Sequence, residues 1–293
     1  MTQGPPSALK ADGVRLVDGE FVFQAEDFRR IASLLHDEAG IALTESKATL
    51  VYSRLAKRLR SLGLESFRDY CALVAGADGA DERQRMIAAL TTNVTRFFRE
   101  PHHFEHLKTV VLPPLLALAR RGGAVRIWSA GCSTGEEPFS IALTILSLAP
   151  EAADWDVRIL ATDIDVHVLE HAREALYSVS NVLQVPGDLR ERWFQREGDR
   201  YRVAEAARRM VVFNELNLMG GWPMRRSFQA IFCRNVVIYF EEPTQARVFS
   251  RFVPLMAPSS FLYLGHSERM VGPAAERLES RGVTIYGLKG AGR

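Results

Sequence analysis

Two adjacent glutamates, Glu136 and Glu137, follow a turn of small residues that runs from Gly131 to Gly135. The apolar segment 125–128 precedes the turn and is typical of a buried strand, and apolar residues at helical spacing follow it. Small residues between a strand and a helix let a ligand approach the backbone closely. Carboxylates at the helix entrance favour a ligand with an ammonium group and ribose hydroxyls over a ligand with phosphates.

Two phosphate-binding motifs compete with this interpretation. A dinucleotide fingerprint counted from Gly131 requires glycine at positions 133 and 136, where the chain has Ser133 and Glu136. A Walker loop requires Gly-Lys followed by Ser or Thr, and the sequence lacks it. The turn therefore favours S-adenosylmethionine, which carries an ammonium, a sulfonium and no phosphate. A purely structural strand–helix turn stays open as the alternative.

Two further expected strands end in polar residues. Asp163 follows the apolar segment 157–161, and Arg234 and Asn235 follow the segment 230–233. The carboxyl ends of parallel strands meet at one edge of a sheet, so these side chains should converge on the glycine turn. Asp163 is suited to bind ribose hydroxyls, but an Asp at a strand end is about as often the N-cap of the next helix.

The composition bounds the class of protein. The chain has 293 residues, is 47% hydrophobic and carries a net charge of +2, which is ordinary for a globular protein of one or two domains. Its charge gives no argument for nucleic acid or for a membrane surface. The three cysteines are widely spaced and fit neither a metal site nor a disulfide framework, so we expect no metal and a cytoplasmic location.

The pattern along the chain predicts two domains. We expect a flexible tail over residues 1–18, an all-helical domain over 19–90 without strands, and an α/β domain over 91–293. Strand-like runs in the last segment alternate with helical ones, which predicts a mostly parallel, Rossmann-like sheet. The alternation breaks over about 176–212, where we expect an inserted antiparallel β subdomain with a hairpin near residues 193–203.

Five segments together resemble the chemotaxis receptor glutamate methyltransferases, the CheR family. They are residues 91–100 (TTNVTRFFRE), 133–138 (STGEEP), 161–165 (ATDID), 233–240 (CRNVVIYF) and 265–268 (GHSE), in the family's order. The resemblance implies a helical N-terminal domain followed by an S-adenosylmethionine-binding methyltransferase domain. It implies transfer of a methyl group to glutamate side chains on the cytoplasmic helices of bacterial chemoreceptors, which leaves S-adenosylhomocysteine.

The resemblance also implies roles for individual residues. Glu137, with or without Glu136, would hold the amine of the cofactor, and Asp163 would take the ribose. Tyr239 would lie near the methyl-transfer point, although a strand-end aromatic that packs in the core remains its alternative. The remaining cofactor positions match Asn93, Thr95, Arg99, Gly131, Asn217, Leu218, Arg234 and Asn235.

The chemistry asks little of the protein beyond positioning. A glutamate carboxylate is already ionised near neutral pH and attacks the methyl carbon directly, so no general base is needed. The protein must hold the two reacting atoms at about 3–3.5 Å. Arg99 is the candidate that orients the incoming carboxylate. Its alternative is an exposed helix cation paired with Glu100.

A basic helix face and the inserted hairpin are candidate receptor contacts. Spacings of three or four residues bring four cations together on the helical domain, where they would attract an acidic receptor helix or remain merely solvated: Arg54, Lys57, Arg58 and Arg60. In part of the family the hairpin binds a peptide at the receptor C-terminus. The short turn over residues 195–200 favours an enzyme that is independent of this tether. We separately expect a monomer, because nothing in the sequence demands a larger assembly.

Two other function classes compete with a protein-glutamate methyltransferase. A non-catalytic module that binds S-adenosylmethionine would not need Arg99, Asn235 and Tyr239 together. A methyltransferase of small molecules or nucleic acid would leave no base-labile methyl ester on protein, and the net charge of +2 gives nucleic acid little support.

Replacing Arg99 tests its assignment to the incoming carboxylate. Arg99→Ala should lower the rate of methyl transfer roughly 100-fold, because one positioned cation near the reacting group is lost. Much of the affinity for S-adenosylhomocysteine should remain. Single-turnover transfer from labelled cofactor and calorimetry measure the two quantities, and near-normal transfer would remove Arg99 from the mechanism.

Overall fold

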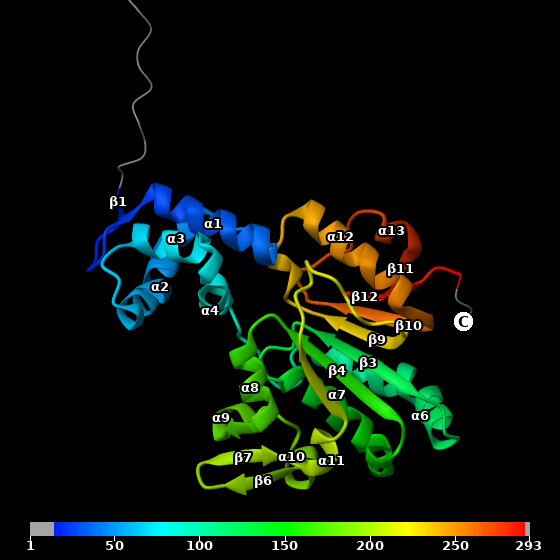
Figure 1. Cartoon of the computed structure of the whole chain (residues 1–293). Coiled ribbons are helices and arrows are strands. Elements are labelled where there is room, and N and C mark those ends of the chain that lie inside the picture. Colours follow the sequence, from blue (N-terminus) through cyan, green and yellow to red (C-terminus); the bar gives the residue numbers. More distant parts are fainter. Residues whose placement is uncertain (1–14, 291–293) are drawn as a thin grey trace, which may run out of the picture. The chain divides into compact units, whose positions relative to one another are not determined.

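The computed structural model describes residues 15–290, which form two compact units (Figure 1). The first unit ends at Thr91 and the second begins at Thr92. The first unit packs four helices, which contact one another in the pairs α1–α3, α2–α4 and α3–α4. These helices are α1 (Ala25–Ala39), α2 (Ala48–Leu62), α3 (Phe67–Ala75) and α4 (Ala80–Leu90). Two 3-10 turns, Glu45–Lys47 and Ala77–Gly79, precede α2 and α4.

Aromatic rings fill the core of this helical unit. Phe23 and Phe67 are fully buried with ring centroids 4.4 Å apart, and Tyr52 lies 5.5 Å from Phe67. Burial of such rings supplies most of the stabilisation available to a unit of this size. Helix α1 begins with a capping box between Gln24 and Asp27, which satisfies backbone amides of its first turn.

The four helices confirm the helical fold expected for this unit, with one addition that the sequence did not indicate. The segments β1 (Arg15–Val17) and β2 (Phe23–Gln24) pair as a short antiparallel ladder before α1. The predicted tail over residues 1–18 therefore ends too late, and its part before Arg15 lies outside the described residues. Strands of two or three residues are too short to give a periodic signal, and β1 also contacts α2, which is distant in sequence.

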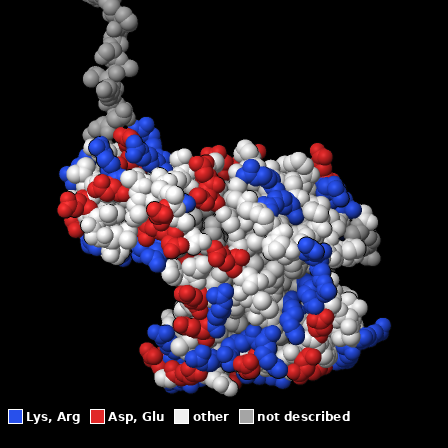
Figure 2. All heavy atoms as spheres, viewed as in Figure 1, with Lys and Arg blue, Asp and Glu red and all other residues white. Residues whose placement is uncertain are grey.

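The basic helix face is also corrected. Arg54 donates hydrogen bonds to the carbonyls of Ala89 and Thr91, at 3.2 and 2.6 Å, and thereby closes the C-terminal end of α4. Arg58 makes a bidentate ion pair with buried Glu82. Neither cation lies free on a solvent-facing surface, as the interpretation of one four-cation face assumed. Figure 2 shows acidic and basic side chains intermixed over this unit.

Lys57 and Arg60 are the two members of that set which are exposed, and Arg60 pairs with Glu20 at 2.8 Å. Both partners of this pair are about half exposed, with side-chain fractions of 54% and 52%. A pair in that position contributes little to stability, because solvent screens it.

The second unit is built on a seven-stranded sheet in the order β11-β12-β10-β9-β3-β4-β8. The strands β10, β9, β3, β4 and β8 are parallel, and β12 and β11 add an antiparallel edge. Their bounds are β3 (Val125–Ala130), β4 (Val157–Asp163), β8 (Val211–Glu215), β9 (Phe228–Cys233), β10 (Met256–Leu264), β11 (Leu278–Gly282) and β12 (Ile285–Leu288). The expected Rossmann-like fold is confirmed.

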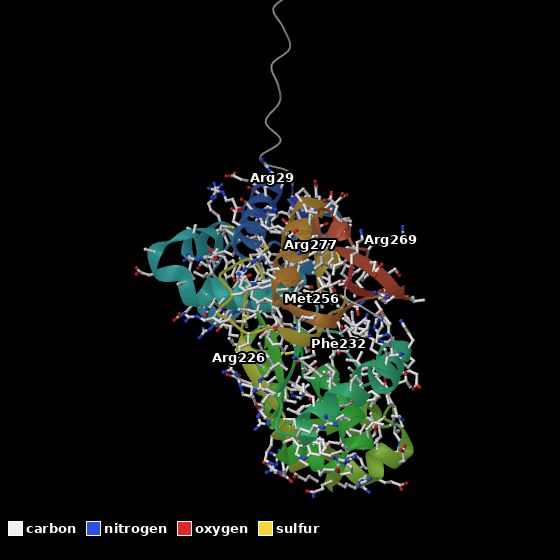
Figure 3. All side chains as sticks on the ribbon, turned by 90° about the vertical axis from the view of Figure 1, so that its right-hand side faces the viewer. Arg29, Arg226, Phe232, Met256, Arg269 and Arg277 are labelled. Atoms are coloured by element: carbon white, nitrogen blue, oxygen red, sulfur yellow. The ribbon has the colours of Figure 1, made fainter. Side chains whose placement is uncertain are left out.

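Helices cover this sheet from both sides. Helix α7 (Glu136–Leu148) packs against β4 and β8, in a core that includes Ile127 and Ile159. On the opposite face Phe252 of α12 (Glu242–Phe252) meets Trp128 at 5.2 Å. At the centre of the sheet Phe232, labelled in Figure 3, stacks on Tyr263 at 4.2 Å.

The other helical segments of this unit are short or irregular. Before the sheet lie α5 (Pro101–His106), a π-helical turn (Leu107–Val111) and α6 (Leu112–Arg120). Between strands lie 3-10 turns at Pro150–Asp154, Val237–Tyr239 and Val253–Leu255, together with α8 (Val166–Glu174) and α13 (Ala274–Arg277). Among residues 15–290 no helix is both long and apolar enough to cross a lipid bilayer.

The predicted insertion contains a small antiparallel sheet in the order β5-β7-β6. It combines β5 (Leu176–Ser178), β6 (Phe194–Glu197) and β7 (Arg200–Val203) with the short helices α9 (Val179–Val182), α10 (Gly187–Trp193) and α11 (Glu205–Arg208). The hairpin turn between β6 and β7 contains only Gly198 and Asp199. The predicted end of the insertion at residue 212 overlaps β8, which begins at Val211 and belongs to the main sheet.

Removal of one partner of the Arg58–Glu82 pair should destabilise the helical unit. Arg58→Ala leaves the Glu82 carboxylate buried with only the Tyr70 hydroxyl and the distant Arg85 beside it. We expect the free energy of unfolding to fall by about 3 kcal/mol in urea titrations. The matched control Arg60→Ala breaks an exposed pair and should cost below about 1 kcal/mol. Equal losses in the two variants would contradict a structural role for Arg58.

Candidate functional site

The site lies where the chain order of the main sheet reverses. From β3 the chain proceeds to β4 and β8 on one side and returns through β9 and β10 on the other. Ligands of such sheets bind outside the carboxyl ends of the strands at this switch point. The turn after β3, the acids after β4 and the polar residues after β9 all lie at this edge, as the sequence predicted.

The turn after β3 is held against its neighbours by its backbone. The amides of Gly131 and Cys132 donate to the carbonyl of Thr162, at 2.7 and 2.9 Å. Gly131 has a φ of +77°, and a Cβ there would lie 2.3 Å from Cγ2 of Val236. A side chain at Gly131 is excluded twice, by the backbone conformation and by the loop after β9.

Glu137 points toward the switch point. Its carboxylate accepts a hydrogen bond from Ser129 Oγ at 2.7 Å and pairs with Arg234 Nη1 at 3.0 Å, and its side chain is 12% exposed. Burial raises the pKa of Glu137, and the Arg234 guanidinium opposes that rise. The carboxylate also lies in the first turn of α7, where the helix dipole favours negative charge.

Glu136 faces away from these groups. Its carboxylate accepts from Thr134 Oγ1 at 2.6 Å and from Asn181 Nδ2 of α9 at 3.3 Å. Burial raises the pKa of Glu136, while its hydrogen bonds lower it. The structure therefore separates the two glutamates that sequence left equivalent, since only Glu137 lies beside Arg234.

The acids after β4 have different tasks. Asp163 is 8% exposed and accepts from the backbone amides of Ser133 at 2.8 Å and of Asp165 at 3.1 Å. Asp165 is the N-cap of α8, where it accepts from the amide of His167. Asp165 also accepts from Asn93 Nδ2 at 2.8 Å. The helix-cap alternative thus applies to Asp165, and Asp163 joins the ends of β3 and β4. Burial raises the pKa of Asp163.

The segment before α5 carries Arg99 in an unusual turn. Phe98 and Glu100 both have left-handed backbone conformations, with φ of 52° and 57°. Such conformations are costly for residues with a side chain and concentrate at functional sites. The Phe98 amide donates to Ser140 Oγ at 2.9 Å. Arg99 is half-buried outside any helix and donates to the Val94 carbonyl, and its predicted alternative pairing with Glu100 is absent from the described contacts.

A loop after β9 carries Asn235 and Tyr239, and a buried carboxylate anchors it. Oxygens of Glu268, which is 3% exposed, accept from the backbone amides of five residues: Asn235, Val236, Val237, Ile238 and Gly265. Burial raises the pKa of Glu268, and these amides oppose the rise. Gly265 is required there, because a Cβ would lie 2.5 Å from Asn235 Nδ2.

The sequence assigns no role to Glu268, which anchors the loop after β9. It closes the Gly-His-Ser-Glu segment that contributed to the family resemblance, which was the available signal. Tyr239 is half-buried in the 3-10 turn that this carboxylate holds. Thr95 is half-buried in the linker, and no role beyond its position follows from its contacts.

Asn217 and Leu218 follow β8 at the same edge of the sheet. Asn217 Oδ1 accepts from the Met219 amide at 2.9 Å, which shapes the turn. Leu218 is 7% exposed, and its carbonyl accepts from Trp222 and Arg251. An apolar side chain at the end of this strand is suited to contact a flat base.

The donor set fits a cofactor with an ammonium and ribose hydroxyls. The carboxylates of Glu137, in the first turn of α7, and of Asp163, at the end of β4, lie at this edge, and no lysine accompanies them there among the described residues. Two carboxylates would repel a pyrophosphate, whereas they accept hydrogen bonds from an ammonium or from vicinal hydroxyls. The site therefore fits S-adenosylmethionine.

One group of residues near the site has metal-ligating atoms close together. Ligand atoms of Glu100, His102 and His103 lie within 4.8 Å of one another. Glu100 already pairs with Arg234 and His266, and the guanidinium charge opposes a second cation. The cluster is better explained as part of the ion-pair network.

Comparison with known proteins gives matches over nearly the whole described chain. Residues 26–91 match the CheR methyltransferase all-alpha domain, and residues 93–286 match the CheR methyltransferase SAM binding domain. A probable chemotaxis protein methyltransferase of Rhizobium etli is 52% identical over 266 residues, which cover 89% of this chain and 99% of the relative. The chemotaxis protein methyltransferase of Escherichia coli is 42% identical over 269 residues, which cover 89% and 90%.

The chain belongs to the CheR methyltransferase family. It is accordingly a chemotaxis protein-glutamate methyltransferase that uses S-adenosylmethionine. In this CheR protein the SAM binding domain coincides with the second compact unit, and every residue described above lies within it.

The Glu268 anchor can be tested by its effect on cofactor binding. Glu268→Ala removes the acceptor of five backbone amides, so the loop that carries Asn235 and Tyr239 should lose its conformation. We expect affinity for S-adenosylhomocysteine to fall about tenfold or more, a loss of at least ~1.4 kcal/mol. Calorimetry measures it, and exposed Glu276→Ala is the control. Unchanged affinity in Glu268→Ala would contradict the anchoring role.

Proposed function

We propose that Glu137, and not Glu136, binds the ammonium of S-adenosylmethionine. One observation carries this assignment: the Glu137 carboxylate lies between Ser129 at the end of β3 and Arg234 at the end of β9, directly at the switch point. Glu136 is instead engaged by Asn181 of the insertion. A carboxylate at the edge where ligands of such sheets bind supports the amine role, while a carboxylate turned toward α9 does not.

The remaining donor contacts follow from the same edge. Asp163 binds the ribose hydroxyls with the lone pairs that the amides of Ser133 and Asp165 leave available. Asn217 and Leu218 contact the adenine, and Asn235 lines the pocket from the loop after β9. Asn93 and Thr95 shape the linker side, where the Asn93 carbonyl accepts from Ser133 Oγ at 2.9 Å. Gly131 leaves the approach to the turn open.

Methyl transfer then depends on positioning. The cofactor supplies an activated methyl group on a sulfonium. Arg99 orients the receptor carboxylate through its guanidinium, whose planar fork matches a carboxylate. The hydroxyl of Tyr239 donates a hydrogen bond near the reacting atoms. Neither residue removes a proton, because the attacking carboxylate is ionised at neutral pH.

Receptor recognition uses what remains exposed on the helical unit and on the insertion. Lys57 and Arg60 lie on the solvent-exposed side of α2 and attract an acidic receptor helix. The two-residue turn at Gly198 and Asp199 leaves the β6–β7 hairpin short, which supports methylation without a tethered C-terminal peptide. We propose that the protein acts as a cytoplasmic monomer on the cytoplasmic helices of chemoreceptors.

A pair of neutral variants tests the amine assignment. Glu137→Gln keeps the shape of the side chain and removes its charge, so affinity for S-adenosylhomocysteine should fall at least tenfold, or ~1.4 kcal/mol. Glu136→Gln is the matched control from the adjacent position and should change that affinity much less. Calorimetry at one pH and salt concentration compares them, and a larger loss in Glu136→Gln would reverse the assignment.

A further inference from the structure

Glu137, Arg234 and Glu100 form a chain of two ion pairs at the proposed amine site. Arg234 has a side chain that is 1% exposed and lies between two carboxylates. Its Nη1 is 3.0 Å from Glu137 Oε2, and its Nη2 is 3.3 Å from Glu100 Oε2. Arg234 also donates to the backbone carbonyl of Arg99 and lies over the ring of Phe104 at 5.5 Å.

This chain of ion pairs affects how strongly an ammonium is attracted to Glu137. Glu137 and Arg234 alone carry a net charge of zero, so the guanidinium would offset much of the attraction between Glu137 and a second cation. Glu100 adds a negative charge, and the three groups together carry −1. Because these side chains are 12%, 1% and 11% exposed, solvent screens their charges weakly. The net negative charge of these three side chains therefore favours the binding of a cationic group.

Glu100 is held as a charged group. Oε1 accepts from the backbone amide of His266 at 3.1 Å and from its Nδ1 at 3.0 Å. Burial would raise the pKa of Glu100, but Arg234 and His266 outweigh it and lower the pKa to about 2. His103 lies 3.5 Å from Oε2, and burial together with Arg234 and His102 lowers its pKa to about 3, so it is neutral.

Glu100 is also part of the turn that carries Arg99. Its own backbone is left-handed, and its carboxylate contacts tie it to β10's following loop through His266 and to the end of β9 through Arg234. The same guanidinium holds the Arg99 carbonyl. These contacts explain how a costly backbone conformation persists immediately beside Arg99.

We propose that Glu100 is a positioning residue of the donor site, which neutralises Arg234 so that Glu137 keeps a net negative charge for the cofactor's ammonium. This inference rests on the amine role proposed for Glu137. It concerns a residue outside the donor set, since Glu100 contacts the site only through Arg234 and the Arg99 turn.

Two ligands that differ in the amino-acid part separate this role from a general structural one. S-adenosylhomocysteine carries the ammonium, whereas methylthioadenosine keeps the adenosine and thioether and lacks the amino-acid part. Glu100→Gln should weaken S-adenosylhomocysteine at least tenfold in calorimetry and leave methylthioadenosine within about twofold. Glu105→Gln removes an exposed carboxylate on α5, the helix that Glu100 directly precedes; it is the matched control and should change neither affinity.

A double variant tests the charge balance itself. Arg234→Gln combined with Glu100→Gln returns the net charge near Glu137 to −1, so affinity for S-adenosylhomocysteine should recover relative to Glu100→Gln alone. Thermal unfolding of each variant checks that it is folded. If the double variant does not fold, the two-ligand comparison with Glu100→Gln decides by itself.

The outcomes that overturn the proposal are specific. Equal weakening of both ligands by Glu100→Gln would mean that Glu100 only supports the fold of the site. No weakening of either ligand would mean that Arg234 does not offset Glu137. If Glu137→Gln also weakens both ligands equally, the amine role of Glu137 fails, and that failure is distinguishable from failure at Glu100.

Discussion

The proposed donor site depends on the two ion pairs of the buried Arg234 guanidinium. This guanidinium joins α7 through Glu137, the linker turn through Glu100 and the Arg99 carbonyl, and its own position at the end of β9. A cation that is 1% exposed must be compensated by nearby negative charge, since an unpaired buried charge is very costly. The need to compensate Arg234 therefore fixes the positions of the two carboxylates and of the turn that carries Arg99.

A second constraint acts on the loop that follows Arg234. Glu268 gathers the backbone amides of the loop after β9, so the loop has a defined conformation although it contains no regular strand. Gly131 and Gly265 allow this loop to approach its neighbours, because a Cβ at either position would overlap Val236 or Asn235. The site is thus built from irregular segments whose geometry is set by buried carboxylates.

The helical unit shows how charge patterns can mislead. Four cations at helical spacing predicted one recognition face, but Arg58 serves a buried glutamate and Arg54 closes the end of α4. Spacing along a helix places side chains near one another but does not say whether they point to solvent or to a neighbouring helix. The partners of Arg54 and Arg58 lie 24 to 37 residues away in sequence, beyond any local pattern.

The amino-acid sequence by itself determined the helical unit, the parallel sheet with its insertion and the sheet edge at which the polar side chains converge. These features depend on periodicity and short motifs, such as residues 133–138, that are local in the chain. Only the tertiary structure distinguished the surroundings of Glu136 and Glu137, because successive residues of a helix are turned by about 100° and face different neighbours. It alone identified the partners of Arg234, because Glu137 and Arg99 lie 97 and 135 residues away and meet it through the order of the strands.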